Sequence, residues 1–154
     1  MAAFQPQDPD FATRVRDSFA RQKAMAYIGA QLCAVAPGRI EIALPYRPEL
    51  TQQHGFIHGG IVGMIADNAC GYAAFSLLPA TASIVTAEYK LNLLAPAAGE
   101  RLIAQGMVLR PGRSLVVAQA EVRAVTAGGG TQVAAALATL MILRDREDAP
   151  RPLA

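Results

Sequence analysis

The chain has 154 residues, which is enough for one compact domain and too few for two of ordinary size. Hydrophobic residues make up 53% and charged residues 17%, so apolar material exceeds that of a typical soluble domain and a second subunit would be one way to cover it. The net charge of +2 comes from scattered lysines and arginines, which argues against a nucleic-acid-binding surface.

The N-terminal segment, residues 1–29, carries one predicted surface helix. Residues 11–28 repeat apolar side chains at helical spacing, with polar and charged residues between them. The first ten residues contain no basic stretch followed by an apolar one, so they do not resemble a secretory signal. We therefore expect a cytoplasmic protein in which Cys33 and Cys70, each within an apolar stretch, are buried free thiols.

A β-hairpin is predicted next. Residues 31–36 and 39–44 are short apolar segments on either side of a Pro-Gly dipeptide, which is a turn signal. Residues 45–53 are expected to form a loop, because Pro48 does not allow the second strand to continue as a paired strand.

Residues 57–78 predict one long helix that is apolar almost all round, so protein has to surround it on most sides. Asp67 lies near its centre, and a carboxylate there is costly in a bilayer, which favours a buried helix over a membrane span. Gly63 and Gly71 each cost about 1 kcal/mol relative to alanine in a helix interior. We expect close approach of a sheet or a ligand to compensate for both.

Four long strands are predicted after this helix. The first, residues 85–93, alternates apolar and polar side chains, so one face is apolar: Val85, Ala87, Tyr89, Leu91 and Leu93. The others, residues 101–110, 114–126 and 131–143, are separated by short glycine-containing turns. Residues 144–154 are charged and rich in proline, and they are expected to form a disordered tail.

This order of elements predicts an α+β domain over residues 30–143. Strands joined by tight turns form an antiparallel sheet, and the long helix is the only predicted element apolar enough to be wrapped by it. The strand after the helix is expected at an edge of the sheet, and edge strands are usually covered or paired. Pairing with the same strand of a second copy would give a homodimer and use the surplus of apolar surface.

Two features of the central helix suggest chemistry. Gly59 and Gly60 lie where it begins, and a helix N-terminus offers unpaired N–H groups that a substrate carbonyl can approach. Asp67 is a carboxylate among apolar residues, and partial burial makes such a group a better base or nucleophile. The alternatives are a sharp turn for the glycines and an exposed polar stripe for Asp67 and Asn68.

The spacing of these groups adds a constraint. His58 and Asp67 are nine positions apart, which places their backbones about 13 Å apart along a straight helix. Groups at that separation do not easily act on one carbonyl. Two antiparallel copies of the helix would bring Gly59 of one chain near Asp67 of the other, so the chemistry requires a dimer.

Other kinds of site find little support in the sequence. The two histidines, His54 and His58, have no cysteines at ligand spacing near them, so we expect no metal. No Gly-x-Ser-x-Gly motif is present, and Cys70 is expected to be an inert core thiol. The glycines at residues 128–130 precede a strand rather than a helix, so they predict a turn and not a dinucleotide-binding loop.

A His-Gly-Gly motif followed by an aspartate marks the start of the central helix. It lies in the segment Gln52-Gln53-His54-Gly55-Phe56-Ile57-His58-Gly59-Gly60-x6-Asp67. Two later segments accompany it: Leu94-Ala95-Pro96-Ala97 with Gly99, and Arg110-Pro111-Gly112-Arg113-Ser114. Together they resemble the hotdog-fold acyl-CoA thioesterases of the phenylacetate-pathway (PaaI-type) branch. The resemblance implies an antiparallel sheet wrapped around a long helix, and hydrolysis of an acyl- or aroyl-CoA thioester.

The resemblance also implies roles for the residues of the motif. Asp67 matches the helix carboxylate that acts as nucleophile or as base for a water, and Gly59 matches the glycine whose N–H polarises the thioester carbonyl. His58 matches the histidine that supports the loop and the substrate end of the site, with Gly60 as a neighbouring substrate contact. In this family the carboxylate and the glycine come from different subunits.

Further positions follow from the same resemblance. An Asn or Gln six residues before the histidine helps to place the water or the carbonyl; Gln52 occupies that position, with Gln53 as the alternative. Thr86 falls where the family has a Ser or Thr that acts with the aspartate. CoA binds near the strand hairpins, which makes Arg110 and Arg113 candidates for its phosphates. Solvated turn residues are the alternative for these two arginines.

The sequence therefore predicts an acyl-CoA thioesterase that needs no cofactor beyond the CoA of its substrate. We expect a homodimer or a dimer of dimers, with no nucleic-acid or membrane partner. The alternative is a non-catalytic hotdog protein that binds acyl-CoA or a lipid, against which the complete set of His58, Gly59 and Asp67 argues. A hotdog dehydratase or hydratase would need a histidine and a carboxylate at that family's own spacing, which the sequence lacks.

Overall fold

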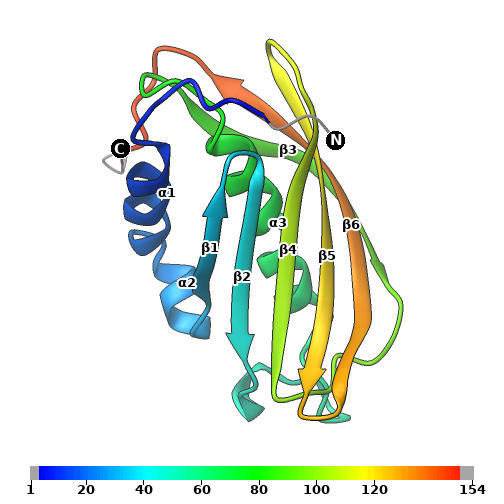
Figure 1. The fold of residues 1–154 in the computed structure, drawn as a ribbon. Coiled ribbons are helices and arrows are strands. Elements are labelled where there is room, and N and C mark those ends of the chain that lie inside the picture. The colour runs from blue at the N-terminus through cyan, green and yellow to red at the C-terminus, as the bar shows by residue number, and fades with distance from the viewer. Residues whose placement is uncertain (1–3, 150–154) are drawn as a thin grey trace, which may run out of the picture.

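The structure, a computed structural model, describes residues 4–149 and has one six-stranded antiparallel sheet curled around a helix (Figure 1). The strands are β1 (Gln31–Ala36), β2 (Arg39–Pro45), β3 (Ser83–Leu93), β4 (Arg101–Pro111), β5 (Leu115–Thr126) and β6 (Gly129–Leu143). The helices are α1 (Phe11–Ala20), α2 (Lys23–Ile28), the short 3-10 helix η1 (Pro48–Leu50) and the central α3 (Gly59–Phe75). Neighbouring strands follow the order β1-β2-β4-β5-β6-β3. The predicted α+β arrangement is confirmed, and β3 is an edge strand as expected.

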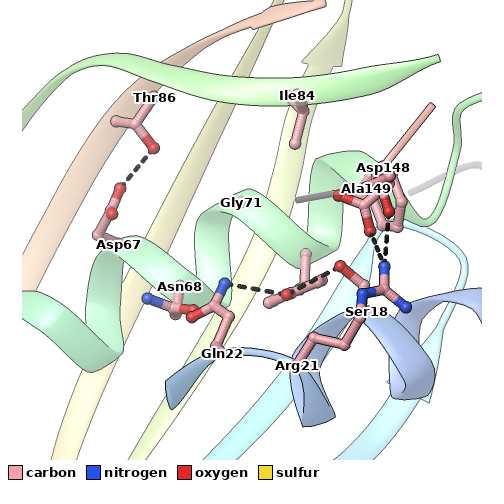
Figure 2. A pocket seen from close by; sticks show the side chains of 12 residues that line it. Ser18, Arg21, Gln22, Asp67, Asn68, Gly71, Ile84, Thr86, Asp148 and Ala149 are labelled. Carbon is pink, nitrogen blue, oxygen red and sulfur yellow. Dashed lines mark hydrogen bonds and ion pairs between the residues drawn. The ribbon is translucent and has the colours of Figure 1, made fainter. Parts of the chain in front are cut away.

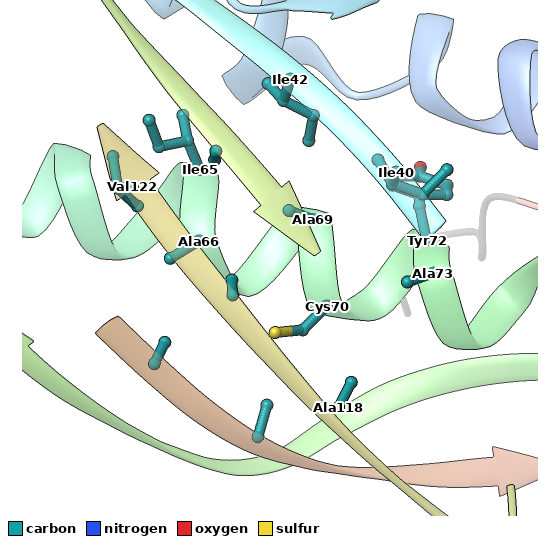
Figure 3. Close-up of a cluster of buried hydrophobic side chains, with 14 of the residues drawn as sticks. Ile40, Ile42, Ile65, Ala66, Ala69, Cys70, Tyr72, Ala73, Ala118 and Val122 are labelled. Carbon is teal, nitrogen blue, oxygen red and sulfur yellow. The ribbon is translucent and has the colours of Figure 1, made fainter. Parts of the chain in front are cut away.

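Helix α3 fills the concave side of the sheet because its side chains are mostly small or aliphatic. Its buried residues are Val62, Gly63, Ile65, Ala66, Ala69, Cys70, Tyr72, Ala73, Ala74 and Phe75. Ile40 and Ile42 of β2 and Val122 of β5 belong to the same buried cluster (Figure 3). A β-carbon on Gly106 of β4 would lie 2.2 Å from the carbonyl oxygen of Ala69, so only glycine lets β4 lie this close to the helix.

The prediction of a single helix over residues 11–28 is wrong, because α1 and α2 are separated at Gln22. The backbone of Gln22 is extended, with φ −76° and ψ 98°. Its side-chain Nε2 donates a hydrogen bond to Tyr72 Oη at 2.9 Å. The helical spacing of residues 11–28 does not indicate this break, because the hydrogen bond that holds Gln22 comes from Tyr72 of α3. Val15 and Phe19 of α1 still join the core around α3.

Arg14 of α1 donates hydrogen bonds to backbone carbonyls just beyond the C-terminal end of α3. Its guanidinium donates to Leu78 O at 2.6 Å and to Pro79 O at 2.9 Å, and it lies 4.3 Å from the centroid of the Phe75 ring. Its Nε is 2.9 Å from Asp8 Oδ2. Carbonyls near the C-terminal end of a helix lack intrahelical donors, and the Arg14 guanidinium supplies hydrogen bonds to them. Its positive charge also complements the negative end of the helix dipole.

Strand β3 does not have the single apolar face predicted for it. Its register against β6 shifts between Thr86 and Glu88, so Ala87 is an extra residue in a β-bulge. A one-residue insertion exchanges the two faces. Thr86 therefore shares the helix-facing side with Leu91, whereas Val85 lies on the outer face with 42% of its surface exposed.

The prediction that both cysteines are buried holds for one of them. Cys70 is fully buried in α3, and Cys33 is exposed on β1. The register of β1 against β2 shifts between Leu32 and Ala34, so Cys33 is the extra residue of a bulge on an edge strand. Both cysteines are free thiols.

The segment after β6 contacts the turn that follows α3 and the end of α1. Arg146 N donates to Thr81 O at 2.9 Å, and Arg21 forms an ion pair with Asp148 at 2.6 Å. These contacts differ from the predicted disordered tail over residues 144–149; the rest of that tail, residues 150–154, lies outside the described residues. No helix within residues 4–149 combines the length and the apolar character needed to span a bilayer.

Candidate active site

Within residues 4–149, one backbone N–H at the N-terminus of α3 has no hydrogen-bond partner. His58 is the N-cap: its Nδ1 accepts a hydrogen bond from Gly60 N at 2.9 Å. The carbonyl oxygen of His58 accepts from Ile61 N at 2.9 Å and from Val62 N at 3.1 Å. Of the first four N–H groups of the helix, only that of Gly59 finds no acceptor among the described residues. Gly59 N–H is thus free to polarise a carbonyl, while Gly60 N–H is occupied.

Gly59 opens onto a small cavity of about 130 Å³. Gln52, Leu93 and Pro96 are among the residues that line it, and a β-carbon on Gly59 would lie 2.8 Å from Leu93 Cδ1. Gln52 is half-buried there, and its Oε1 accepts a hydrogen bond from the backbone N–H of His54. Gln53 is exposed and does not line this cavity. The geometry therefore favours Gln52 over Gln53 as the residue near Gly59.

Asp67 lies about two helical turns beyond Gly59 in α3 and, like Gly59, faces β3. Thr86 Oγ1 donates a hydrogen bond to Asp67 Oδ1 at 2.7 Å (Figure 2). Burial raises the pKa of Asp67 above its usual value, and the bond from Thr86 opposes this rise. The carboxylate is consequently more basic than an exposed aspartate and is held in one orientation. Burial also raises the pKa of Cys70 to about 12, as expected for an inert thiol.

A cavity of about 410 Å³ extends from Asp67. One wall comes from α3 and a second from β3, and a third comes from α1 and the segment after β6 (Figure 2). The α3 and β3 residues are Asp67, Asn68, Gly71, Tyr72, Phe75, Ile84 and Thr86. Asn68 Nδ2 donates to Met64 O at 3.2 Å, while its buried Oδ1 has no partner among the described residues. The site thus joins a held carboxylate to a space large enough for an acyl group.

The wall from α1 was not predicted from the sequence. Ser18 Oγ lies 3.1 Å from Tyr72 Oη, which also accepts from Gln22, and Arg21 pairs with Asp148. Ser18 and Arg21 are three positions apart, so helical periodicity places them on one side of the end of α1, whereas Gln22 lies at the break between the two helices. That spacing alone does not say that this side faces α3, because the contact is long-range.

One chain does not bring all predicted site residues together. Asp67 and Thr86 share one cavity, whereas Gly59 and Gln52 line another, in agreement with the separation expected along the helix. Arg110 and Arg113 are exposed and line neither cavity. Arg113 lines a third hollow together with residues just beyond α3. Each chain therefore holds the predicted site residues in two separate groups.

No group of three or more His, Cys, Asp or Glu side chains within residues 4–149 is arranged to hold a metal ion. The expectation that no cofactor is needed stays a prediction.

Comparisons with known proteins match most of the chain. A family model described as Thioesterase superfamily matches residues 54–130, half of the chain. A crystal structure of a thioesterase family protein from Silicibacter pomeroyi is 50% identical, with a TM-score of 0.86, and the match covers 87% of this chain and 98% of that one. A Halobacterium salinarum protein classed provisionally as an esterase is 31% identical over 147 residues, 90% of this chain and 97% of the relative.

A structural likeness extends to more distant proteins. The E. coli PaaI protein from the phenylacetic acid degradation operon has a TM-score of 0.80 at 18% identity, over 92% of this chain and 99% of that one. At this identity the likeness shows a shared fold. The motif from residue 54 to Asp67 and strands β3, β4 and β5 fall within the matched family region, whereas α1, the β1–β2 hairpin and nearly all of β6 lie outside it.

Proposed function

The chain belongs to the thioesterase superfamily and has the hotdog fold of its PaaI-type members, and from that premise we propose that it hydrolyses an acyl- or aroyl-CoA thioester to the free acid and CoA. The observation that carries this proposal is the pair of half-sites on α3. One is Asp67, oriented by Thr86 beside a cavity of about 410 Å³. The other is the free N–H of Gly59 at the N-terminus of the same helix. Acyl transfer needs both a base or nucleophile and an oxyanion donor.

In the proposed reaction the thioester carbonyl is polarised by Gly59 N–H, assisted by the positive end of the helix dipole. Water adds to the carbonyl carbon while Asp67 accepts its proton, and the carbonyl oxygen becomes an oxyanion at Gly59. The C–S bond then breaks, and the CoA sulfur takes up the proton. Alternatively, an Asp67 oxygen attacks the carbonyl carbon and the C–S bond breaks, which gives a mixed anhydride and the CoA thiolate. Water then cleaves the anhydride to the free acid and Asp67, and the proton released goes to the thiolate. His58 keeps the loop in place by capping the helix, and Gln52 assists near Gly59.

The two half-sites are proposed to combine across a homodimer. Among the described strands, β3 is an edge strand that pairs with β6 alone. Two of its large hydrophobic residues are exposed to solvent: Tyr89 with 45% of its surface and Leu93 with 58%. Antiparallel pairing of β3 with its copy would extend the sheet and cover these side chains. The same two-fold axis would set α3 helices antiparallel, with Gly59 of one subunit near Asp67 of the other; a dimer of dimers is a further expectation.

We propose that the CoA portion of the substrate binds near the β4–β5 turn. Arg110 and Arg113 are exposed near the β4–β5 turn, where guanidinium groups can pair with phosphate oxygens. We propose no cofactor, no nucleic-acid or membrane partner, and a cytoplasmic location, in which the free thiols of Cys33 and Cys70 would persist.

Substitution of Asp67 tests the activity. Asp67→Asn keeps the shape of the side chain and its bond from Thr86 but removes the base, so turnover should fall by about 100- to 10,000-fold. Release of free thiol from acyl-CoAs of short, long and aromatic type is the measurement, and gel filtration checks that the oligomer is retained. Full turnover in Asp67→Asn would refute the role. A protein that binds acyl-CoA without releasing thiol would instead support the non-catalytic binder.

A further inference from the structure

Gly71 is not required by the packing of the chain. It lies in the interior of α3, where glycine is less favourable than alanine. A β-carbon on Gly63 would lie 3.1 Å from Tyr89 Oη and 3.3 Å from Leu91 Cδ2, so packing against β3 accounts for that glycine. A β-carbon on Gly71 would have only Leu140 Cδ2 within 4 Å among the described residues, at 3.7 Å, which is an ordinary contact. The expected close approach of the sheet is thus confirmed at Gly63, whereas at Gly71 the sheet leaves room and the expected approach of a ligand stays a prediction.

The space beside Gly71 belongs to the cavity of Asp67. Gly71 follows Asp67 by one helical turn and precedes Phe75 by another, so the three residues line one face of α3 with Gly71 in the middle. Ile84 and Thr86 of β3 form the facing wall (Figure 2). A substituent that extends from a carbonyl at Asp67 toward Phe75 therefore has to pass over Gly71.

Helix α1 fixes the remaining wall of this cavity. Tyr72 directly follows Gly71, and its Oη is bonded to Gln22 at 2.9 Å and to Ser18 at 3.1 Å. Separating α1 from α3 would break these bonds and leave buried polar atoms unpaired, which is costly. A wide acyl group cannot easily gain room by displacing α1. The space for a wide acyl group is present instead beside Gly71, which has no β-carbon.

We infer that Gly71 determines acyl specificity, because its missing β-carbon lets a flat or branched acyl group, such as an aromatic ring, lie against α3. The ring would extend from Asp67 toward the apolar side chain of Phe75. A volume of about 410 Å³ lies within the range of pockets that hold small organic ligands. The inference rests on the proposed function, since it concerns the acyl part of the same substrate.

Gly71→Ala tests this inference with benzoyl-CoA and acetyl-CoA as substrates. We expect kcat/KM for benzoyl-CoA to fall at least about 10-fold, because one added methyl group in an apolar pocket has an effect of that order. The value for acetyl-CoA should change by less than about twofold, since so small a group does not reach Gly71. The Tm should rise by roughly 2–4 °C because alanine is the better helix former.

Gly128→Ala is the matched control. It lies in the β5–β6 turn, where a β-carbon would have its nearest neighbour, Thr126 Oγ1, at 3.9 Å. Both substrates should be hydrolysed as by the wild type. An unchanged benzoyl-CoA rate in Gly71→Ala, an equal loss with both substrates, or loss of the oligomer in gel filtration would overturn the inference. A wild-type protein that hydrolyses no acyl-CoA would refute the proposed function itself, and the inference with it.

Discussion

Removal of the Gly59 N–H by substitution with proline isolates the proposed oxyanion donor. Gly59 is the first residue of α3, a position that proline favours because its missing N–H has no intrahelical partner. The preceding His58 has φ −60° and ψ 137°, a conformation that a following proline accepts. Gly59 N–H has no partner among the described residues, so the substitution breaks no hydrogen bond of the fold. The helix should therefore form in Gly59→Pro.

The expected loss is that of a single oxyanion donor, about 100- to 1,000-fold in kcat, or roughly 2.7–4 kcal/mol of transition-state stabilisation. A second effect has to be separated from it, because any β-carbon on Gly59 would lie 2.8 Å from Leu93 Cδ1. Gly59→Ala introduces the same crowding and keeps the N–H, so it is the matched reference. The end of the Leu93 side chain can rotate away in both variants.

The assay measures thiol release under steady-state conditions, with kcat and KM determined separately for Gly59→Pro and Gly59→Ala. We expect kcat to fall in the proline variant relative to the alanine variant, with a much smaller change in KM. Circular dichroism and gel filtration establish that both variants fold and assemble alike. Equal kcat values for the two folded variants would refute the assignment of Gly59 as oxyanion donor.

Two further predictions concern Thr86 and Arg14. Thr86→Val removes the hydrogen bond that lowers the pKa of Asp67, so the acid limb of the kcat/KM–pH profile should move to higher pH, because the carboxylate is then lost earlier as pH falls; an unmoved limb would contradict this. Arg14→Ala leaves Asp8 and the carbonyls beyond α3 without their donor and should lower the free energy of unfolding by about 2–3 kcal/mol in denaturant titrations, whereas an unchanged midpoint would show that water replaces the guanidinium.

The elements of the fold were predictable where the pattern is local and long. Helix α3 is apolar all round, which identifies it as the element that the sheet surrounds, and the glycines after His58 mark its start. The bulge in β3 was not predictable, because one extra residue at Ala87 leaves the alternation of the sequence intact while exchanging the faces. Cys33 is exposed for a similar reason, because it is the extra residue of a bulge in β1.

The candidate site was predictable in its chemistry and not in its walls. An isolated carboxylate in an apolar helix and a glycine at the helix start are visible in the sequence, as is their separation. The contacts of Ser18 and Gln22 with Tyr72 join positions about fifty residues apart, and no local spacing encodes such a contact. The walls of the Asp67 cavity therefore depend on the long-range packing of α1 against α3.

The most direct test of the central claim is the activity of mixed dimers formed from Asp67→Asn and Gly59→Pro subunits. Each variant alone should be nearly inactive. If Asp67 of one subunit acts with Gly59 of the other, a mixed dimer holds one complete site, and random mixing of equal amounts should restore about a quarter of the wild-type thiol release. Activity no higher than the sum of the two separate variants, with mixed dimers shown to have formed, would contradict a site shared between subunits.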